Sequence, residues 1–118
     1  MKKRIAFDVK GTLGSGPQQK KVFALFQAFE EQGCEMFVWS GVGSFATDLV
    51  RTLGLRAECM TKRTIHDTDP ADLMDIAVED EHQQTYLATK QLVFVDEIPD
   101  SLEDIAEFVR DLITHGHN

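Results

Sequence analysis

Four polar residues end apolar stretches of this 118-residue sequence where strands are expected to stop. Asp8, Ser40 and Lys62 end the first three stretches, and either Asp80 or Asp96 ends a later one. In an open parallel sheet the carboxyl ends of the strands share one edge, so these side chains are expected to converge. Carboxylates hold divalent cations, while a hydroxyl and an ammonium hold phosphoryl oxygens. The pattern predicts a site for a phosphate and a divalent cation, at which Asp8 can attack phosphorus and form an acyl phosphate.

Alternating strands and helices are expected to position these residues. Short, mainly apolar runs predict strands at residues 4–9, 35–40, 55–61 and 91–96. Apolar residues at helical spacing predict helices that run from Pro17 to Gly33, from the capping residue Ser44 to Gly54, and onward from Ser101, which forms a capping-box pattern with Asp104. Such alternation implies parallel pairing. The predicted fold class is α/β, a single Rossmann-like three-layer domain with a mainly parallel central sheet.

The segment from residue 69 to 89 fits two local structures. Asp69-Pro70-Ala71-Asp72 is a good helix start, whereas residues 75–81 also fit a strand that ends in acids. Both alternatives remain open from the sequence. The last four residues, 115–118, are expected to form a frayed tail.

Composition excludes several classes of protein. The formal charge is −8 and the basic residues are scattered, which disfavours nucleic acid binding through net charge. No apolar run approaches the roughly 18 residues of a membrane span, and Asp8 and Lys10 interrupt the first apolar stretch too early for an export signal. Cys34 and Cys59 do not form a disulfide scaffold and are expected to be thiols in a reducing cytoplasm. One domain over residues 1–118 is expected.

Two segments resemble motifs of one known family. Asp8-Val9-Lys10-Gly11-Thr12-Leu13 is similar to the first motif of the haloacid dehalogenase-like (HAD) superfamily, DxDGT followed by Leu or Val. Phe37-Val38-Trp39-Ser40-Gly41 resembles the second motif, an apolar strand that ends in Ser or Thr. The order and spacing of the motifs cover nearly the whole chain. The resemblance implies a Rossmann-like hydrolase fold and a Mg²⁺-dependent phosphatase or phosphotransferase.

The resemblance also implies a role for each matching residue. Asp8 takes the place of the nucleophile and Mg²⁺ ligand. The phosphate is assigned to four residues of the matching motifs, namely Thr12, Ser40, Gly41 and Lys62. Two acidic clusters compete to complete the Mg²⁺ site. The pair Glu79-Asp80, represented by Asp80, is favoured over Asp96-Glu97 with Asp100, because the gap after Lys62 then stays compact.

Lys10 is the main departure from the family pattern. Family members that hydrolyse phosphate esters carry a second Asp two residues after the nucleophile, which protonates the leaving group and then deprotonates water. Lys10 stands there in this sequence and can donate a proton but not readily accept one. Its backbone carbonyl, which in the family binds Mg²⁺, survives the change. Turnover is therefore expected to be weak or lost, while phosphate and metal binding persist.

Few residues are left for a lid over this site. Only residues 13–19 separate the first motif from the first helix, and no extra folding unit follows the second, so no cap insertion is expected. Members of the family without caps act on bulky phosphorylated substrates or use a neighbouring subunit as a lid, which allows a homo-oligomer. The alternative function is a non-catalytic HAD-like domain that binds a phosphoryl ligand or a protein.

A receiver-like signalling domain is a further alternative, because such domains also carry a phosphorylatable aspartate on a parallel sheet. The glycine-threonine turn after Asp8 fits that class poorly. The strand that ends at Val95-Asp96-Glu97 lacks the lysine expected there.

Overall fold

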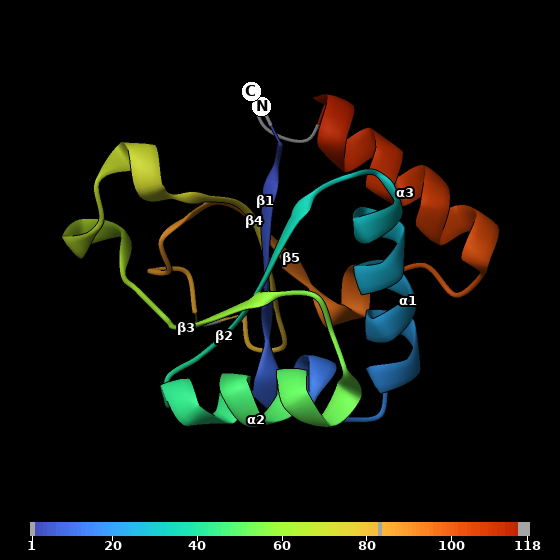
Figure 1. Ribbon diagram of the computed structural model, residues 1–118. Coiled ribbons are helices and arrows are strands. Elements are labelled where there is room, and N and C mark those ends of the chain that lie inside the picture. Colours follow the sequence, from blue (N-terminus) through green and yellow to red (C-terminus); the bar gives the residue numbers. More distant parts are fainter. Residues whose placement is uncertain (1, 83, 116–118) are drawn as a thin grey trace.

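A five-stranded sheet, flanked by helices, forms the centre of the computed structural model, which describes residues 2–82 and 84–115 (Figure 1). Its strands are β1 (Arg4–Asp8), β2 (Glu35–Ser40), β3 (Glu58–Thr61), β4 (Met74–Glu79) and β5 (Thr89–Phe94). They lie in the order β3-β2-β1-β4-β5, and every neighbouring pair is parallel. The chain extends the sheet on one side of β1 and then on the other, as in doubly wound folds. The predicted α/β, Rossmann-like fold class is confirmed.

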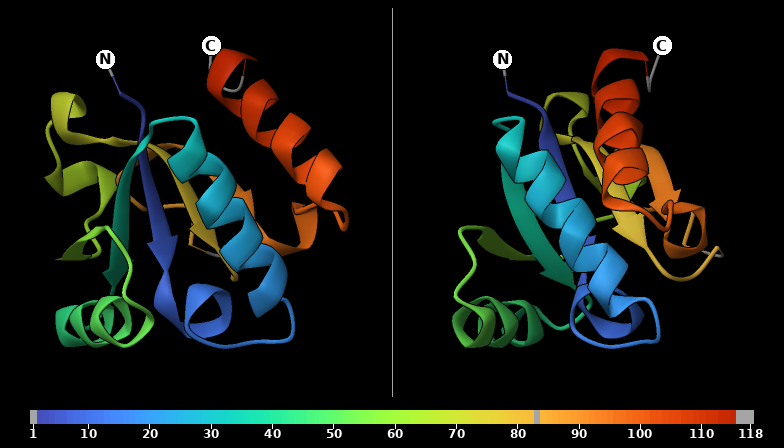
Figure 2. Two further views of the ribbon diagram at one scale, coloured as in Figure 1. Left: turned by 45° about the vertical axis from the view of Figure 1, so that its right-hand side comes forward. Right: turned by 90° about the vertical axis from the view of Figure 1, so that its right-hand side faces the viewer.

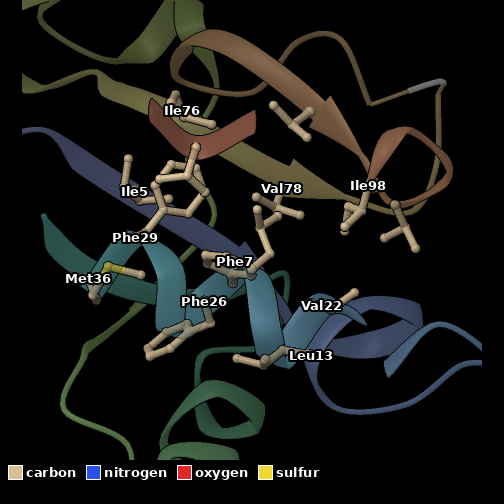
Figure 3. Packing of buried hydrophobic residues seen from close by; sticks show 14 of the residues in the cluster. Ile5, Phe7, Leu13, Val22, Phe26, Phe29, Met36, Ile76, Val78 and Ile98 are labelled. Carbon is tan, nitrogen blue, oxygen red and sulfur yellow. The ribbon is translucent and has the colours of Figure 1, made fainter. Parts of the chain in front are cut away.

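Three α-helices pack against this sheet: α1 (Gln19–Glu31), α2 (Gly43–Leu53) and α3 (Leu102–His115). Helices α1 and α3 lie side by side on one face in both views of Figure 2. The rings of Phe26 and Phe29 on α1 reach Phe7 of β1 (Figure 3), with the Phe7 and Phe26 centroids 5.2 Å apart. Each fully buried phenylalanine stabilises the fold by roughly 1.5–3 kcal/mol. This apolar cluster fixes β1, and with it the end of the strand at Asp8.

The opposite face of the sheet is covered by irregular chain. Between β3 and β4 the chain makes two short turns, η2 (Ile65–Asp67) and η3 (Pro70–Asp72), to the left of the sheet in Figure 1. The segment after β4 pairs with this layer through an antiparallel bridge between Thr64 and Leu87. Leu87 joins Trp39 in a second apolar cluster on this face. Phe37 of β2 and Met74 and Ala77 of β4 belong to this cluster and are buried as well.

Several element boundaries differ from the sequence-based expectations. Ser44 does not cap α2, because the helix begins at Gly43 after an extended Val42. The third strand is shorter than expected and begins at Glu58. The ambiguous segment contains strand β4, and its expected helix start is only the turn η3, held by a bond from the Ala71 amide to the Asp69 side chain. The last strand lies slightly earlier than predicted, at Thr89–Phe94.

The predicted cap of the last helix is confirmed, since the Asp104 amide donates to Ser101 Oγ over 3.1 Å. The tail expected at residues 115–118 lies outside the described residues, apart from the end of α3 at His115. Over residues 2–82 and 84–115, none of the helices has the length and apolar character needed to cross a bilayer.

Candidate functional site

A cleft of about 290 Å³ opens at the carboxyl ends of the strands, where parallel α/β sheets place their ligands. Six of the residues chosen from the sequence line it: Asp8, Lys10, Ser40, Gly41, Lys62 and Asp80. They come from the ends of four different strands and from the turn after β1. The structure thus brings together residues that are up to 72 positions apart in the chain, between Asp8 and Asp80.

Lys62 bridges two buried carboxylates in this cleft. Its Nζ lies 2.9 Å from Asp8 Oδ1 and 2.7 Å from Glu79 Oε1, and it also donates to Gln84 Oε1 over 2.8 Å. The second oxygen of Glu79 accepts a bond from Trp39 Nε1 at 2.9 Å. Glu79 is fully buried, so both of its oxygens need these donors. The ammonium of Lys62 is held at the place where Asp8 ends β1.

The Asp8 carboxylate is also held by the turn that follows β1. Thr12 is fully buried and its hydroxyl donates to Asp8 Oδ2 over 3.2 Å. The turn closes through a bond of 2.7 Å from the Gly14 amide to the Val9 carbonyl. Thr12, assigned to the phosphate from the sequence, therefore touches Asp8 and does not line the cleft. In this position it can orient the Asp8 carboxylate.

Gly11 allows this turn to approach the end of β4. Its φ is +78°, a conformation that favours glycine, and a side chain there would collide with the Asp80 carboxylate. Lys10 precedes it with an extended backbone and an exposed side chain that lines the cleft. The glycine of the first motif thus brings the turn against Asp80.

Burial shifts the proton affinity of the buried groups. Burial raises the pKa of Asp8 to about 6; Lys62 opposes this shift and Asp80 adds to it. The pKa of Glu79 rises to about 7, first through burial and then through the charge of Asp8, against the effects of Lys62 and Trp39. Burial lowers the pKa of Lys62, but Glu79 and Asp8 outweigh it and leave the pKa above its ordinary value. The lysine stays charged while the two acids titrate near neutral pH.

Three acids of the cleft are close enough to share a metal ion. One ligand atom from each of Asp8, Glu79 and Asp80 lies within 4.8 Å of the other two. Carboxylate oxygens are the ligands of Mg²⁺ and Ca²⁺. Asp8 and Asp80 line the cleft, whereas the fully buried Glu79 does not. Asp8 and Asp80 are therefore the residues that best fit a divalent cation.

Ser40 and Gly41 form the wall at the end of β2. The Ser40 side chain is buried, and its Oγ accepts a bond of 3.3 Å from the Val42 amide. This leaves the hydroxyl proton of Ser40 free to point at a ligand oxygen. The backbone carbonyl of Ser40 accepts from the Lys62 amide over 2.9 Å, which ties the two residues together. A hydroxyl and an ammonium thus reach the same cleft as the acids.

The alternative acid, Asp96, lies elsewhere. It follows β5 on the short turn η4 (Val95–Glu97), is exposed, and sits 3.2 Å from His82 Nε2. Asp96 does not belong to the residues that line the cleft. Of the two acidic clusters weighed from the sequence, the one that contains Asp80 is at the cleft.

Sequence reasoning did not find the outer wall of the cleft. Five further residues line it: Val42, Phe45, Glu81, Gln84 and Tyr86. Phe45 lies only four residues after Gly41, the end of the second motif, and this closeness in sequence could have placed it at the cleft. Gln84 and Tyr86 belong to the long loop after β4, and no pattern in the sequence places this loop over the site. The sequence also did not predict that Trp39 donates a hydrogen bond to Glu79, because an apolar strand predicts only hydrophobic packing.

Comparisons of the chain with models of known protein families, with curated proteins and with solved structures find no match.

Proposed function

We propose that this chain is a small HAD-like protein without a cap that carries out Mg²⁺-dependent phosphoryl transfer through Asp8, slowly because of Lys10. One observation carries the proposal: a buried aspartate, a lysine 2.9 Å away, a serine and a second aspartate line one cleft at the carboxyl edge of a parallel sheet. These are the groups that hold a phosphoryl group and a divalent cation.

Each residue has a proposed task. Ser40, the Gly41 backbone and Lys62 bind the phosphoryl oxygens, and the bond from Thr12 orients the Asp8 carboxylate. Asp8, Asp80 and the backbone carbonyl of Lys10 are the groups proposed to hold Mg²⁺, which when bound would neutralise charge on the phosphoryl oxygens. Lys62 keeps Asp8 oriented and supplies a positive charge beside it.

The first step forms a bond between an Asp8 oxygen and phosphorus while the bond from phosphorus to the ester oxygen breaks. The leaving oxygen takes a proton from the Lys10 ammonium, which lines the cleft. In the second step water attacks phosphorus and releases Asp8, and a base must take a proton from that water. A lysine amine in contact with water regains a proton at neutral pH before this step, and the resulting ammonium has no lone pair with which to take another. The aspartyl phosphate is therefore expected to form faster than it breaks down.

Lys10 also supports a second candidate function, a phosphoryl-binding domain without turnover. Loss of a positioned acid and base typically removes about 10²- to 10⁴-fold in rate. The buried groups that would bind phosphate and metal do not depend on the Lys10 side chain, which is exposed. In this second function the cleft binds a phosphorylated ligand, and Asp8 holds the cation without being phosphorylated.

The cytoplasm is the proposed location of either function. Cys34 and Cys59 are both free thiols in the structure, which fits a reducing compartment. The proposed ligand is a phosphorylated small molecule, because the cleft volume of about 290 Å³ is close to the lower limit of the usual range for small-molecule sites, about 300–1,000 Å³.

Hydrolysis of an aryl phosphate tests the proposal directly. Wild type, Asp8→Asn, Lys10→Asp and Lys10→Ala are assayed with Mg²⁺ and with EDTA, and the protein is examined by mass spectrometry for an added phosphoryl group. Wild type is expected to gain the phosphoryl group and turn over slowly. Lys10→Asp should hydrolyse roughly 100-fold faster or more, and Asp8→Asn should do neither. Lys10→Ala is the matched control, because it removes the ammonium without supplying a base.

Two outcomes separate the candidates. Turnover only in Lys10→Asp, with no phosphoryl group on wild type, would favour the binding domain. Silence in all four proteins, together with no shift in melting temperature on adding Mg²⁺ and beryllofluoride, would contradict both candidates.

A further inference from the structure

Three exposed apolar side chains stand at the same cleft as the acids and the lysine. Val42 is 50% exposed, Phe45 is 52% exposed and Tyr86 is 50% exposed. Exposed apolar residues are common when scattered, but three around one polar cleft form a patch. An apolar wall around a small number of convergent polar groups is typical of a small-molecule site.

The backbone under both rings is fixed. Phe45 lies in the first turn of α2, where its amide donates to the Val42 carbonyl over 3.0 Å, and the next residue, Ala46, is fully buried. The Tyr86 carbonyl accepts from the Ile65 amide over 2.8 Å. The rings therefore stand on anchored segments, and the wall exists before any ligand arrives. A preformed wall reduces the entropy that is lost on binding.

The wall joins the proposed phosphate end directly. The Val42 amide donates to Ser40 Oγ, so the apolar wall begins two residues after the serine that is proposed to hold phosphate. In the part of the chain that the structure describes, neither Phe45 nor Tyr86 stacks on another aromatic ring. Both rings keep half of their surface available.

The charges around the mouth exclude some classes of ligand. Glu81 lines the cleft next to Asp80, and the formal charge of the chain is −8. Three acids, Asp8, Asp80 and Glu81, line the cleft with two lysines, Lys10 and Lys62, and Lys62 already faces Asp8 and Glu79. Further phosphate groups on a ligand would therefore meet an excess of negative charge. A ligand with one phosphate and an uncharged ring suits the cleft better than a polyphosphate or a nucleic acid.

We propose that the ligand of this cleft is a phosphate monoester with one aromatic ring close to the phosphate, the ring packing against Phe45 and Tyr86. The inference rests on the proposed function, because it takes the phosphate end of the cleft from it. Phe45 and Tyr86 are then specificity-determining residues. An aromatic contact adds roughly 0.5–1.5 kcal/mol beyond area burial, about two- to tenfold in affinity per ring.

Two phosphonates that cannot be hydrolysed make the test independent of turnover. Benzylphosphonate and methylphosphonate carry the same charged group and differ by the ring. Their affinities are measured by calorimetry with Mg²⁺ for wild type, Phe45→Ala, Tyr86→Ala and the control Leu102→Ala. Leu102 is 76% exposed at the start of α3 and does not line the cleft. Because Phe45 and Tyr86 are half exposed, their truncation should leave the fold intact, and methylphosphonate binding verifies this.

Wild type should bind benzylphosphonate about tenfold tighter than methylphosphonate. The ratio should fall towards one in Phe45→Ala and Tyr86→Ala and stay at its wild-type value in Leu102→Ala. Equal binding of the two phosphonates by wild type would overturn this inference and leave the proposed function standing. Binding of neither would contradict both. Tighter binding of adenosine 5′-monophosphate than of benzylphosphonate would also overturn it, since that ring lies a sugar away from the phosphate.

Discussion

The substitution Glu79→Gln tests the buried group of Asp8, Lys62 and Glu79 by replacing one carboxylate oxygen with an amide nitrogen. Glu79 is fully buried and its oxygens accept from Lys62 and Trp39. The glutamine keeps the shape of the side chain and removes the negative charge, but offers one acceptor where glutamate offers two. The absolute effect of the substitution thus mixes charge and hydrogen bonding. Its change with pH isolates the charge.

The magnitude follows from the shifted pKa. Burial raises the pKa of Glu79 from 4.5 to about 7, and each unit corresponds to 1.36 kcal/mol, so ionised Glu79 destabilises the folded state by about 3 kcal/mol. Between pH 4.5 and 7 the folded chain retains a proton that the unfolded chain has lost. Stability must therefore fall as pH rises through this window. Asp8, whose pKa rises from 3.8 to about 6, acts in the same direction.

Urea unfolding at pH 5 and pH 8, in EDTA and at constant ionic strength, measures this cost. Relative to wild type, Glu79→Gln should gain about 2.5 kcal/mol in the free energy of unfolding between the two pH values, because part of the cost is already present at pH 5. Glu107→Gln is the matched control, because Glu107 is exposed on α3 and its substitution should produce no such gain. The difference in unfolding free energy between wild type and Glu79→Gln could instead be the same at pH 5 and pH 8. That result would refute the claim that burial raises the pKa of Glu79.

Three further predictions concern the same cleft. Calorimetry should show Mg²⁺ binding about fourfold tighter at pH 8 than at pH 5.5, because a cation requires ionised Asp8, whose pKa is about 6; affinity that does not change with pH would argue against Asp8 as a ligand. Lys62→Met should lower the free energy of unfolding at pH 8 by roughly 3–5 kcal/mol, since it leaves Asp8 and Glu79 without their cation, and by less at pH 5, where both acids are protonated; an equal loss at both pH values in urea unfolding would contradict this. Gly11→Ala should cost about 1–3 kcal/mol through its positive φ and weaken Mg²⁺ binding by displacing Asp80; calorimetry and urea unfolding test both effects, and an unchanged Mg²⁺ affinity would argue against Asp80 as a ligand.

The sequence predicted the elements with strong local signals. The second strand has its predicted bounds, Glu35–Ser40, because a continuous apolar run of this length suits a strand covered on both faces. The buried stripe of α1 and its end before Gly33 also agree with the helical spacing. The start of α2 was wrong because Ser44 favours a cap by residue type alone. Its position is set by the backbone bond from Phe45 to Val42.

The residues of the site were predictable one by one, but their contacts were not. Asp8, Ser40 and Lys62 each follow a strand, and the parallel pattern predicts their common edge. The contact of Lys62 with Glu79 depends on the strand order, because β2 and β1 lie between β3 and β4. Only a long side chain can reach across this distance, and sequence spacing contains no information about it. The long loop that brings Gln84 and Tyr86 over the site has no periodic pattern either.

The composition of the network itself argues for a functional site. Three acids, Asp8, Glu79 and Asp80, lie beside one lysine, Lys62. When all four groups are ionised, they carry a net charge of −2 in and beside a buried position. Apolar residues of similar size would stabilise such a position better than an unbalanced group of charges. In the metal-free protein the two buried acids reduce the imbalance by taking up protons, as their raised pKa values indicate. A divalent cation would balance these two negative charges and release those protons. Such a cation would account for a third acid, Asp80, beside Asp8 and Glu79, whose charges one lysine does not neutralise.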